Sequence, residues 1–349
     1  MDLARSQPGW WIRGPHLQTM WARLARSRRL VGFERESLET PDGDELVLDH
    51  LAGPADAPRV LLLHGTEGSA YSLHTQGLAV LVAAAGWRGT VLNFRSCARD
   101  PLDIRVRLRN RRPRLYHAAD TADLDLVVRL LRAREPGAPL YAIGFSLGGG
   151  VLLKWLGEQA RAGADRPLAA AATISVPYDL AAAARFLERR TARPYVWNFL
   201  RRVRPKALDV LARFPAETTH LDGARIRQAR TLRQFDDSAT APMHGFRDAD
   251  HYYGEASTLP HLPHIRVPTL CISGEDDPFY PAAAIAPARA AASERVRLIV
   301  TPWGGHTGFV TGPWPWRPVY VAEEAVIDWL VEHGAVRRST FTDSTNARR

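Results

Sequence analysis

The stretch LYAIGFSLGGGVLLKWLGE, Leu140 to Glu158, places one serine among four glycines where two apolar segments meet. The first segment, 139–145, has the continuous apolar character of a buried strand, and 149–162 has the length and composition of a helix. Each glycine weakens a strand or a helix by about 0.5–1 kcal/mol relative to alanine. These glycines are therefore expected because the turn between the strand and the helix needs a backbone conformation or a close approach that only glycine allows. The order Gly144-Phe145-Ser146-Leu147-Gly148 is the G-x-S-x-G pattern of a sharp strand-to-helix turn that exposes a serine hydroxyl. The stretch therefore predicts a nucleophilic serine at position 146.

Strand-like and helix-like segments alternate on both sides of this turn. The strand-like runs are 45–51, 59–64, 89–94, 139–145, 168–175, 267–273 and 296–302. The helix-like runs are 75–86, 118–134, 149–162, 282–292 and 319–334. This alternation predicts the α/β class, with a mostly parallel, doubly wound sheet covered by helices on both faces.

The alternation breaks between about residues 177 and 263, where the sequence is helical, arginine-rich and aromatic. An insertion at this point of an open α/β sheet lies over the carboxyl ends of the strands, where ligands bind. We expect a helical lid that contains Phe186, Tyr195, Trp197, Phe199 and Phe214. Those members of the set that face the site would give the lid an apolar inner surface. The expected organisation is an amino-terminal segment (1–30) packed on the body, one domain (31–333) containing the lid, and a flexible tail (334–349).

A serine hydroxyl needs a base to take its proton, and the base needs an acid to fix its tautomer. After such a strand-to-helix turn, the acid and then the histidine follow the serine along the chain. The loop SGEDDPFYP after one strand offers Asp276 and Asp277, and the loop TPWGGHTGFV after the last strand offers His306. Neighbouring side chains of an extended loop point to opposite sides, so only one aspartate faces the histidine. In many proteins with such a serine turn, the acid is the third residue after the glycine that closes the strand. Counted from Gly274 that residue is Asp277, and Asp276 is then expected to bond loop amides or cap the next helix.

The charge that develops on the substrate oxygen needs two backbone N–H donors. One is the amide of Leu147, directly after the nucleophile. The other is expected from HGTEGS, the loop after the strand at 59–64, which makes Thr66 the second donor. We interpret His64 in this loop as a residue that shapes the backbone.

At these residues the sequence resembles the YheT-type branch of the α/β-hydrolases. The matching segments include GPHLQTMWARL, HGTEGS, NFRSC, YHAADTADL, GFSLGGGVLLKWLGE, LRQFDDSATAPMHGF and GGHTGFV, and they span residues 10 to 310. The resemblance implies an α/β-hydrolase fold, hydrolysis of carboxylic esters such as acylglycerols, no cofactor, and a triad of Ser146, Asp277 and His306. One segment departs from the family pattern NFRGCSG: Ser96 stands at the position of its first glycine, and Ala98 at the position of its serine.

Composition narrows the remaining functions. The net charge of +9 comes from dispersed arginines without any nucleic-acid-binding motif, and no metal-ligand spacing is present. No apolar run is long enough to span a membrane, and the sequence starts without the pattern of a secretory signal. Cys97 and Cys271 are expected to be free thiols. We therefore expect the protein to be located in the cytoplasm. The sequence does not set the oligomeric state.

Three hypotheses therefore stand beside the esterase. An acyltransferase or thioesterase would use the same triad, and a non-catalytic binding protein would share only the fold. A peripheral membrane contact is a secondary hypothesis, which rests on tryptophans and arginines near the amino terminus: Trp10, Trp11, Trp21, Arg13, Arg23 and Arg26.

Overall fold

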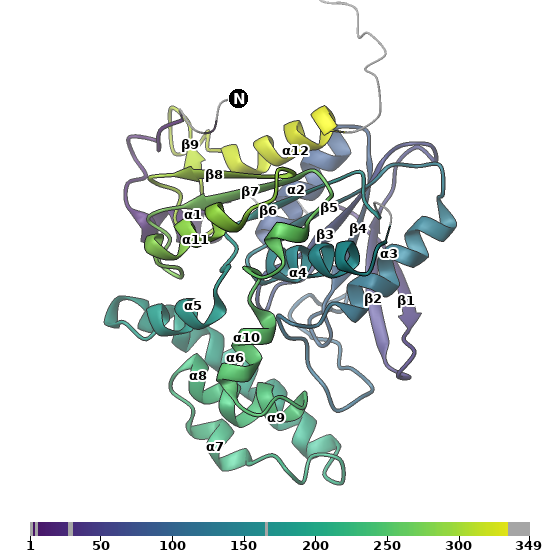
Figure 1. Ribbon diagram of the computed structural model, residues 1–349, viewed down its shortest axis with the longest axis vertical. Helices are drawn as coiled ribbons and strands as arrows, with labels where there is room; N and C mark the ends of the chain where they lie inside the picture. Colours follow the sequence, from purple (N-terminus) through teal and green to yellow (C-terminus); the bar gives the residue numbers. More distant parts are fainter. Residues whose placement is uncertain (1–2, 4–5, 27–30, 165–166, 334–349) are drawn as a thin grey trace, which may run out of the picture.

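The computed structural model describes residues 3, 6–26, 31–164 and 167–333, and an eight-stranded sheet forms its centre (Figure 1). Its strands are β1 (Glu34–Glu39), β2 (Glu45–Leu51), β3 (Arg59–Leu63), β4 (Arg88–Asn93), β5 (Leu140–Phe145), β6 (Ala170–Ile174), β7 (Thr269–Gly274) and β8 (Val296–Thr301). Their order is β1-β2-β4-β3-β5-β6-β7-β8. Strands β3 to β8 pair in parallel, and β2 runs antiparallel to β1 and β4. The mostly parallel sheet predicted from the sequence is confirmed. The predicted tail at 334–349 lies outside the described residues.

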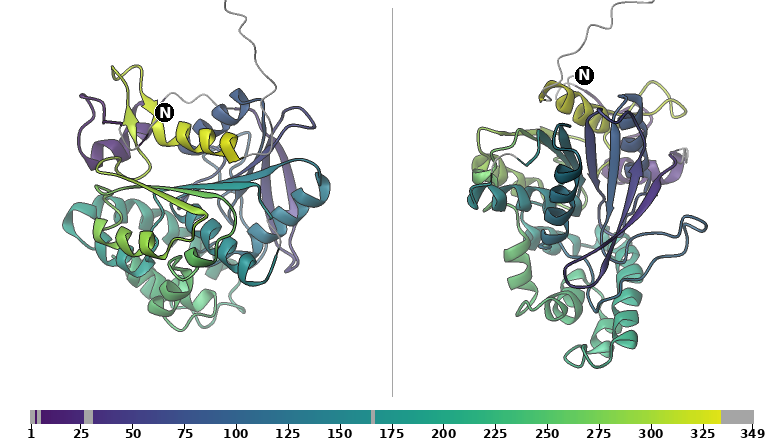
Figure 2. Two further views of the ribbon diagram at one scale, coloured as in Figure 1. Left: turned by 45° about the horizontal axis from the view of Figure 1, so that its top comes forward. Right: turned by 90° about the vertical axis from the view of Figure 1, so that its right-hand side faces the viewer.

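The central strands are buried on both faces, which explains their continuous apolar sequences. In β3, Leu61 and Leu63 belong to the core on one face, and Val60 and Leu62 to the core on the other. Helices cover both sides of the sheet, which Figure 2 (right) shows nearly edge-on. The first core includes residues of α3 (Ala122–Arg134), α4 (Leu147–Arg161) and α11 (Ile285–Ala291), and the second those of α2 (Leu73–Ala84) and α12 (Val321–His333).

A strand that was not predicted and the starts of two helices are the main differences from the sequence prediction. Strand β1 was not predicted, because its sequence ERESLE is charged and carries no apolar alternation. It pairs along its whole length with β2 at the sheet edge. The helix predicted over 282–292 begins with a 3₁₀ turn at Ala282–Ala284, and the first two residues of the helix predicted over 319–334 form the short strand β10 (Val319–Tyr320), which pairs with β9 (Val310–Thr311).

Helices fill the insertion between β6 and β7. They are α5 (Leu180–Leu187), α6 (Arg193–Arg213), α7 (Gly223–Gln228), α8 (Leu232–Phe235), α9 (Ala241–Met243) and α10 (Ala249–Ala256). In Figure 1 they form a group below the sheet and its flanking helices. This group, the lid, has apolar clusters of its own, one of them centred on α6. Within the described residues, no helix combines the length and apolar character needed to cross a membrane.

The amino-terminal segment packs against the far end of the chain. Helix α1 (Pro15–Ala25) carries the buried Gln18, whose side chain donates to the carbonyl of Val310 (2.9 Å) and accepts from its N–H (2.7 Å). The ring of Trp11 packs on that of Trp21, with centroids 4.7 Å apart, and its N–H bonds the carbonyl of Gly312. Of the three tryptophans in the membrane hypothesis, Trp10 alone is largely exposed, at 61%. Membrane contact stays a prediction.

Candidate active site

Ser146 occupies a strained turn between β5 and α4. Its backbone has φ 49° and ψ −118°, a region that residues with a side chain rarely adopt. A Cβ atom at Gly144 would lie 2.6 Å from the backbone of Gly149, and one at Gly148 would lie 2.5 Å from the carbonyl oxygen of His64. The glycines therefore let the turn close and let α4 approach the end of β3.

Three of the predicted site residues form one hydrogen-bonded chain. Nδ1 of His306 lies 2.8 Å from Oδ2 of Asp277, and Nε2 lies 2.9 Å from Oγ of Ser146. Asp277 and His306 are buried and follow β7 and β8, so their strands bring them to the edge where β5 ends. The ring of Phe279 stacks on the imidazole with centroids 4.1 Å apart. This arrangement orients the imidazole so that Nδ1 donates to the carboxylate and Nε2 accepts from the serine.

Hydrogen bonds from outside the triad hold the loop of His306. The N–H of His306 donates to the hydroxyl of Thr19 in α1 (2.9 Å), and that of Thr307 donates to Ser175 (3.0 Å). Asp276 accepts from the N–H of Gly305 (2.8 Å). A bond to a loop amide is one of the two roles that the sequence analysis expected for Asp276. Burial raises the pKa of the Asp276 carboxyl. The sequence analysis did not identify Thr19, because nothing in α1 indicated that it faces a loop almost 300 residues away.

The two predicted oxyanion donors lie beside the serine. Leu147 is the first residue of α4, whose N–H has no carbonyl to bond within the helix. Thr66 follows Gly65, where an added Cβ would lie 3.4 Å from that of Ser146. Across the described ranges, neither the Leu147 nor the Thr66 N–H donates to another protein group. Both amides are thus free to bind a substrate oxygen.

His64 shapes the backbone beside this pair. Its Nε2 accepts from the N–H of Phe94 (3.1 Å), and its Nδ1 lies 2.8 Å from the carbonyl oxygen of Gly65. Burial lowers the pKa of His64 to about 4, so the ring is neutral near pH 7 and links two loops.

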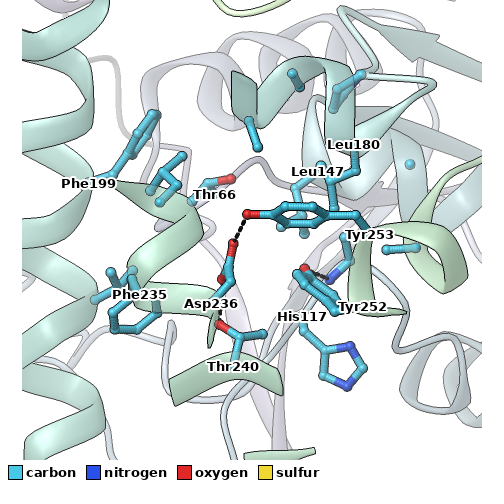
Figure 3. Close-up of a pocket in the computed structure, with 18 of the residues that line it drawn as sticks. Thr66, His117, Leu147, Leu180, Phe199, Phe235, Asp236, Thr240, Tyr252 and Tyr253 are labelled. Atoms are coloured by element: carbon cyan, nitrogen blue, oxygen red, sulfur yellow. Dashed lines mark hydrogen bonds between the residues drawn. The ribbon is translucent and has the colours of Figure 1, made fainter. Parts of the chain in front are cut away.

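An apolar cavity of about 170 Å³ opens beside Ser146 under the lid (Figure 3). Its apolar walls come from the body and from the lid, and they include Leu115, Leu147, Leu180, Leu187, Phe199, Val203, Leu232, Phe235 and Met243. Among the five lid aromatics named from the sequence, Phe199 lines this cavity and Trp197 is 60% exposed. Phe199 is therefore a cavity-facing member of that set and Trp197 is not, and leucines supply much of the wall.

Two acidic side chains also line the cavity, Glu67 and Asp236. Asp236 begins a π-helical turn (Asp236–Thr240), a form often found at functional positions. The hydroxyl of Tyr253 donates to Oδ2 of Asp236 (2.7 Å) and that of Thr240 to Oδ1 (2.6 Å), as Figure 3 shows. Burial raises the pKa of Asp236 to about 6. The sequence analysis did not single out this aspartate, although the pair Asp236-Asp237 between apolar residues was a signal.

A buried ion pair connects the lid to the loop of Thr66. Nζ of Lys206 in α6 lies 2.6 Å from Oε1 of Glu67, and Arg107 lies 2.9 Å from Oε2. The hydroxyl of Tyr116 donates to the same carboxylate (3.1 Å). Glu67 directly follows Thr66 and has φ 59°, so these contacts fix the backbone beside the second predicted oxyanion donor.

Comparison with known proteins places the chain in a family. A family profile described as "alpha/beta hydrolase fold" matches residues 58–313. The YheT protein of Escherichia coli (strain K12) is 36% identical over 321 residues, which cover 91% of this chain and 90% of that protein. The chain is a YheT-type α/β-hydrolase.

More distant relatives of this hydrolase carry lipid-related names. "Phospholipase ABHD3" of Mus musculus is 32% identical and covers 93% of this chain and 78% of its own length. "Monoacylglycerol lipase" of Saccharomyces cerevisiae is 28% identical over 79% of this chain and 59% of its own length. The esterase Pf2001 of Pyrococcus furiosus shares the fold, with a TM-score of 0.54, 16% identity, and coverage of 93% and 99% of the two chains.

The departure at Ser96 has a structural consequence in this hydrolase. Ser96 has φ 59°, a conformation that glycine adopts without strain, which accounts for the glycine in the family pattern. The serine hydroxyl bonds Oδ1 of Asn110 (2.8 Å). The departure therefore ties the loop after β4 to the following arginine-rich loop.

Proposed function

We propose that this protein hydrolyses carboxylic esters through a covalent acyl-enzyme, with Ser146 as nucleophile, His306 as base and Asp277 as the triad acid. The observation that carries the proposal is the hydrogen-bonded chain Asp277–His306–Ser146 at the wall of an apolar cavity. A triad of this geometry activates a serine on several unrelated folds.

The chemistry follows from the positions of these atoms. Oγ of Ser146 attacks the acyl carbon while Nε2 of His306 takes its proton, and the Asp277 carboxylate stabilises the imidazolium. The N–H groups of Leu147 and Thr66 bind the oxygen of the tetrahedral intermediate. His306 then protonates the departing alcohol oxygen, and a water molecule activated by the same imidazole releases the acid.

The substrate class proposed is an ester with a fatty acyl chain. The apolar walls beside Ser146 suit a hydrocarbon chain, and the buried cavity would exclude water from it. The names of the relatives, a phospholipase and a monoacylglycerol lipase, support lipid esters as the class. No metal or cofactor enters any step of this mechanism.

The test is Ser146→Ala, assayed with p-nitrophenyl esters and with a fluorophosphonate probe. Loss of the hydroxyl should lower kcat by about 10⁴–10⁶ and abolish labelling, as in comparable triads. Ser96→Ala is the matched control, because Ser96 also has a left-handed backbone but lines neither cavity next to Ser146. A Ser146→Ala variant that keeps a tenth of the activity would contradict the assignment. Absence of labelling in the unmodified protein would favour a non-catalytic binding protein.

A further inference from the structure

A second cavity lies next to Ser146 and His306, with walls of a different character. Its volume is about 470 Å³. Its walls come from α1, the loop of Thr66, the start of α2, the loop after β4, and α6, and they include Thr19, Ser69, Ser72, His74, Gln76, Tyr195 and Asn198. Ser146 and His306 line this cavity as well as the apolar one. The reacting atoms therefore lie between an apolar space and a polar one.

Three arginines from distant parts of the chain converge on this polar cavity. Arg23 comes from α1, Arg99 from the loop after β4, and Arg202 from α6. Arg99 and Arg202 are half-buried, and Arg23 is exposed at the rim. Among the ion pairs that the described residues form, none includes any of these three guanidinium groups.

The cavity wall offers no carboxylate to neutralise them. Glu67 is the one acidic residue of the described wall, and its two oxygens are already bound by Lys206 (2.6 Å) and Arg107 (2.9 Å). Some half-buried arginines elsewhere in the molecule do have a carboxylate partner, as Arg26 has in Glu323 and Arg59 in Glu135. The polar cavity therefore carries an excess of positive charge, which Glu67 offsets only in part.

The pKa shifts of Arg99 and Arg202 agree with this excess of positive charge. Burial, followed by the neighbouring charge of Arg107, lowers the pKa of Arg99. Burial, followed by the charge of Arg23, also lowers the pKa of Arg202, and Arg99 adds to this effect. Each positive charge thus raises the cost of the others, and a bound anion would relieve all of them at once.

We propose that this cavity binds a phosphate group on the alcohol side of the ester, so that the substrate is a phosphate-bearing acyl ester such as an acylglycerol phosphate. The proposal rests on the proposed ester hydrolysis. The acyl chain occupies the apolar cavity, and the alcohol with its phosphate lies among Arg23, Arg99 and Arg202. Guanidinium groups bind phosphate oxygens through paired N–H donors, which gives both affinity and orientation. The acyl–oxygen bond breaks, and every phosphorus–oxygen bond stays intact.

Two substrate pairs test the proposal, each with one acyl chain. The first pair is 1-octanoylglycerol and 1-octanoylglycerol 3-phosphate, and the second is S-octanoyl-N-acetylcysteamine and octanoyl-coenzyme A. We expect kcat/KM to be at least about tenfold higher for the glycerol phosphate ester than for its neutral partner, as a few charge-assisted hydrogen bonds would produce. This ratio should fall as salt rises, because the cavity is open to solvent.

Variants identify the residues responsible. Arg202→Gln and Arg99→Gln should each reduce the phosphate-to-neutral ratio of kcat/KM by about tenfold, mainly through KM. Arg201→Gln is the matched control, because Arg201 precedes Arg202 on α6 but is exposed, lies over the Trp197 ring and does not line the cavity. Thermal unfolding and fluorophosphonate labelling show that each variant keeps its fold and its triad.

The outcomes separate this proposal from the one on which it rests. An arginine-dependent preference in the coenzyme A pair alone would support phosphate binding and assign the phosphate to a thioester substrate. A wild-type protein that prefers neither phosphate compound, or a preference that survives both Arg99→Gln and Arg202→Gln, would overturn the phosphate site while leaving ester hydrolysis in place. Failure of labelling and of all four substrates would overturn the proposed function itself.

Discussion

Two successive aspartates after β7 have different partners. Asp277 accepts from His306, and Asp276 accepts from the N–H of Gly305, one residue before the histidine. The sequence analysis expected an extended loop, but Gly274 to Asp277 form a turn in which the N–H of Asp277 bonds the carbonyl of Gly274 (3.4 Å). The two carboxyls have the same chemistry, and this turn directs them to different partners. One aspartate can therefore orient the base while the other holds the loop that carries it.

Substitution of each aspartate by asparagine should distinguish these roles. Asp277→Asn should lower kcat by about 10⁴, because an amide holds the imidazole in the wrong tautomer. Asp276→Asn keeps an oxygen for the Gly305 N–H and removes a desolvated carboxyl, so activity should stay within about tenfold. Both purified variants are assayed on one ester, with thermal unfolding as a check on folding. An inactive Asp276→Asn protein beside an active Asp277→Asn protein would reverse the assignment.

The sequence predicted the residues of the triad better than the residues around them. Ser146, Asp277 and His306 were predictable because each follows a strand whose carboxyl end reaches the same sheet edge. Thr19 and Arg202 were not, because their place at the site depends on how α1 and α6 pack. No local pattern records a contact such as that between Thr19 and His306, which are 287 residues apart.

At the scale of elements, helix α6 is the part of the lid that contributes side chains to the walls of both cavities. Phe199 lines the apolar and the polar cavity, whereas Trp197, two residues earlier, points to solvent and carries the Arg201 guanidinium over its ring. Side chains of a helix repeat every 3.6 residues, so the aromatic residues of α6 cannot all face inward. Which of them does so depends on the rotation of α6, and the sequence does not specify that rotation.

Phe199→Ala should change selectivity more than stability. Removing the ring enlarges the cavity beside Ser146, so kcat/KM should rise for longer acyl chains relative to short ones, by about tenfold over the range from four to twelve carbons. Trp197→Ala is the control on the same helix and should leave the chain-length profile as in the wild type. The measurement is kcat/KM for a graded series of p-nitrophenyl esters. Identical profiles for the two variants would remove α6 from acyl-chain selection.

At the scale of the whole molecule, the sheet was the predictable part and the lid was not. Continuous apolar runs required strands buried on both faces, and these runs gave all strands from β2 to β8. The charged edge strand β1 gave no such pattern. The lid surrounds a partly polar space, in which the positions of buried groups such as Asp236 depend on hydrogen bonds formed only after α8, α9 and α10 have packed together.

Asp236 should make the stability of the whole fold depend on pH. An unfolded aspartate has a pKa of about 3.9, and burial raises the pKa of Asp236 to about 6 in the folded protein. Below pH 4 both states are protonated, so the group causes no loss. As pH rises from 4 to 6, the unfolded chain releases this proton and the folded protein retains it, so the free energy of unfolding falls. Above pH 6 the deficit is constant, at roughly 2–3 kcal/mol for two pKa units.

Asp236→Asn should remove this loss, because an amide keeps an oxygen for the Thr240 hydroxyl and carries no charge. Urea unfolding of both proteins at pH 4, 5, 6 and 7 measures the difference, which we expect to grow in favour of the variant by about 2–3 kcal/mol from pH 4 to pH 7. Asp250→Asn is the control, since the bond from Arg233 lowers the pKa of exposed Asp250. Its stabilisation is lost only as pH falls below the usual aspartate pKa, so the difference between wild type and Asp250→Asn should stay nearly flat from pH 5 to pH 7. A difference between wild type and Asp236→Asn that stays flat over this range would show that Asp236 ionises in the folded protein as readily as in the unfolded chain.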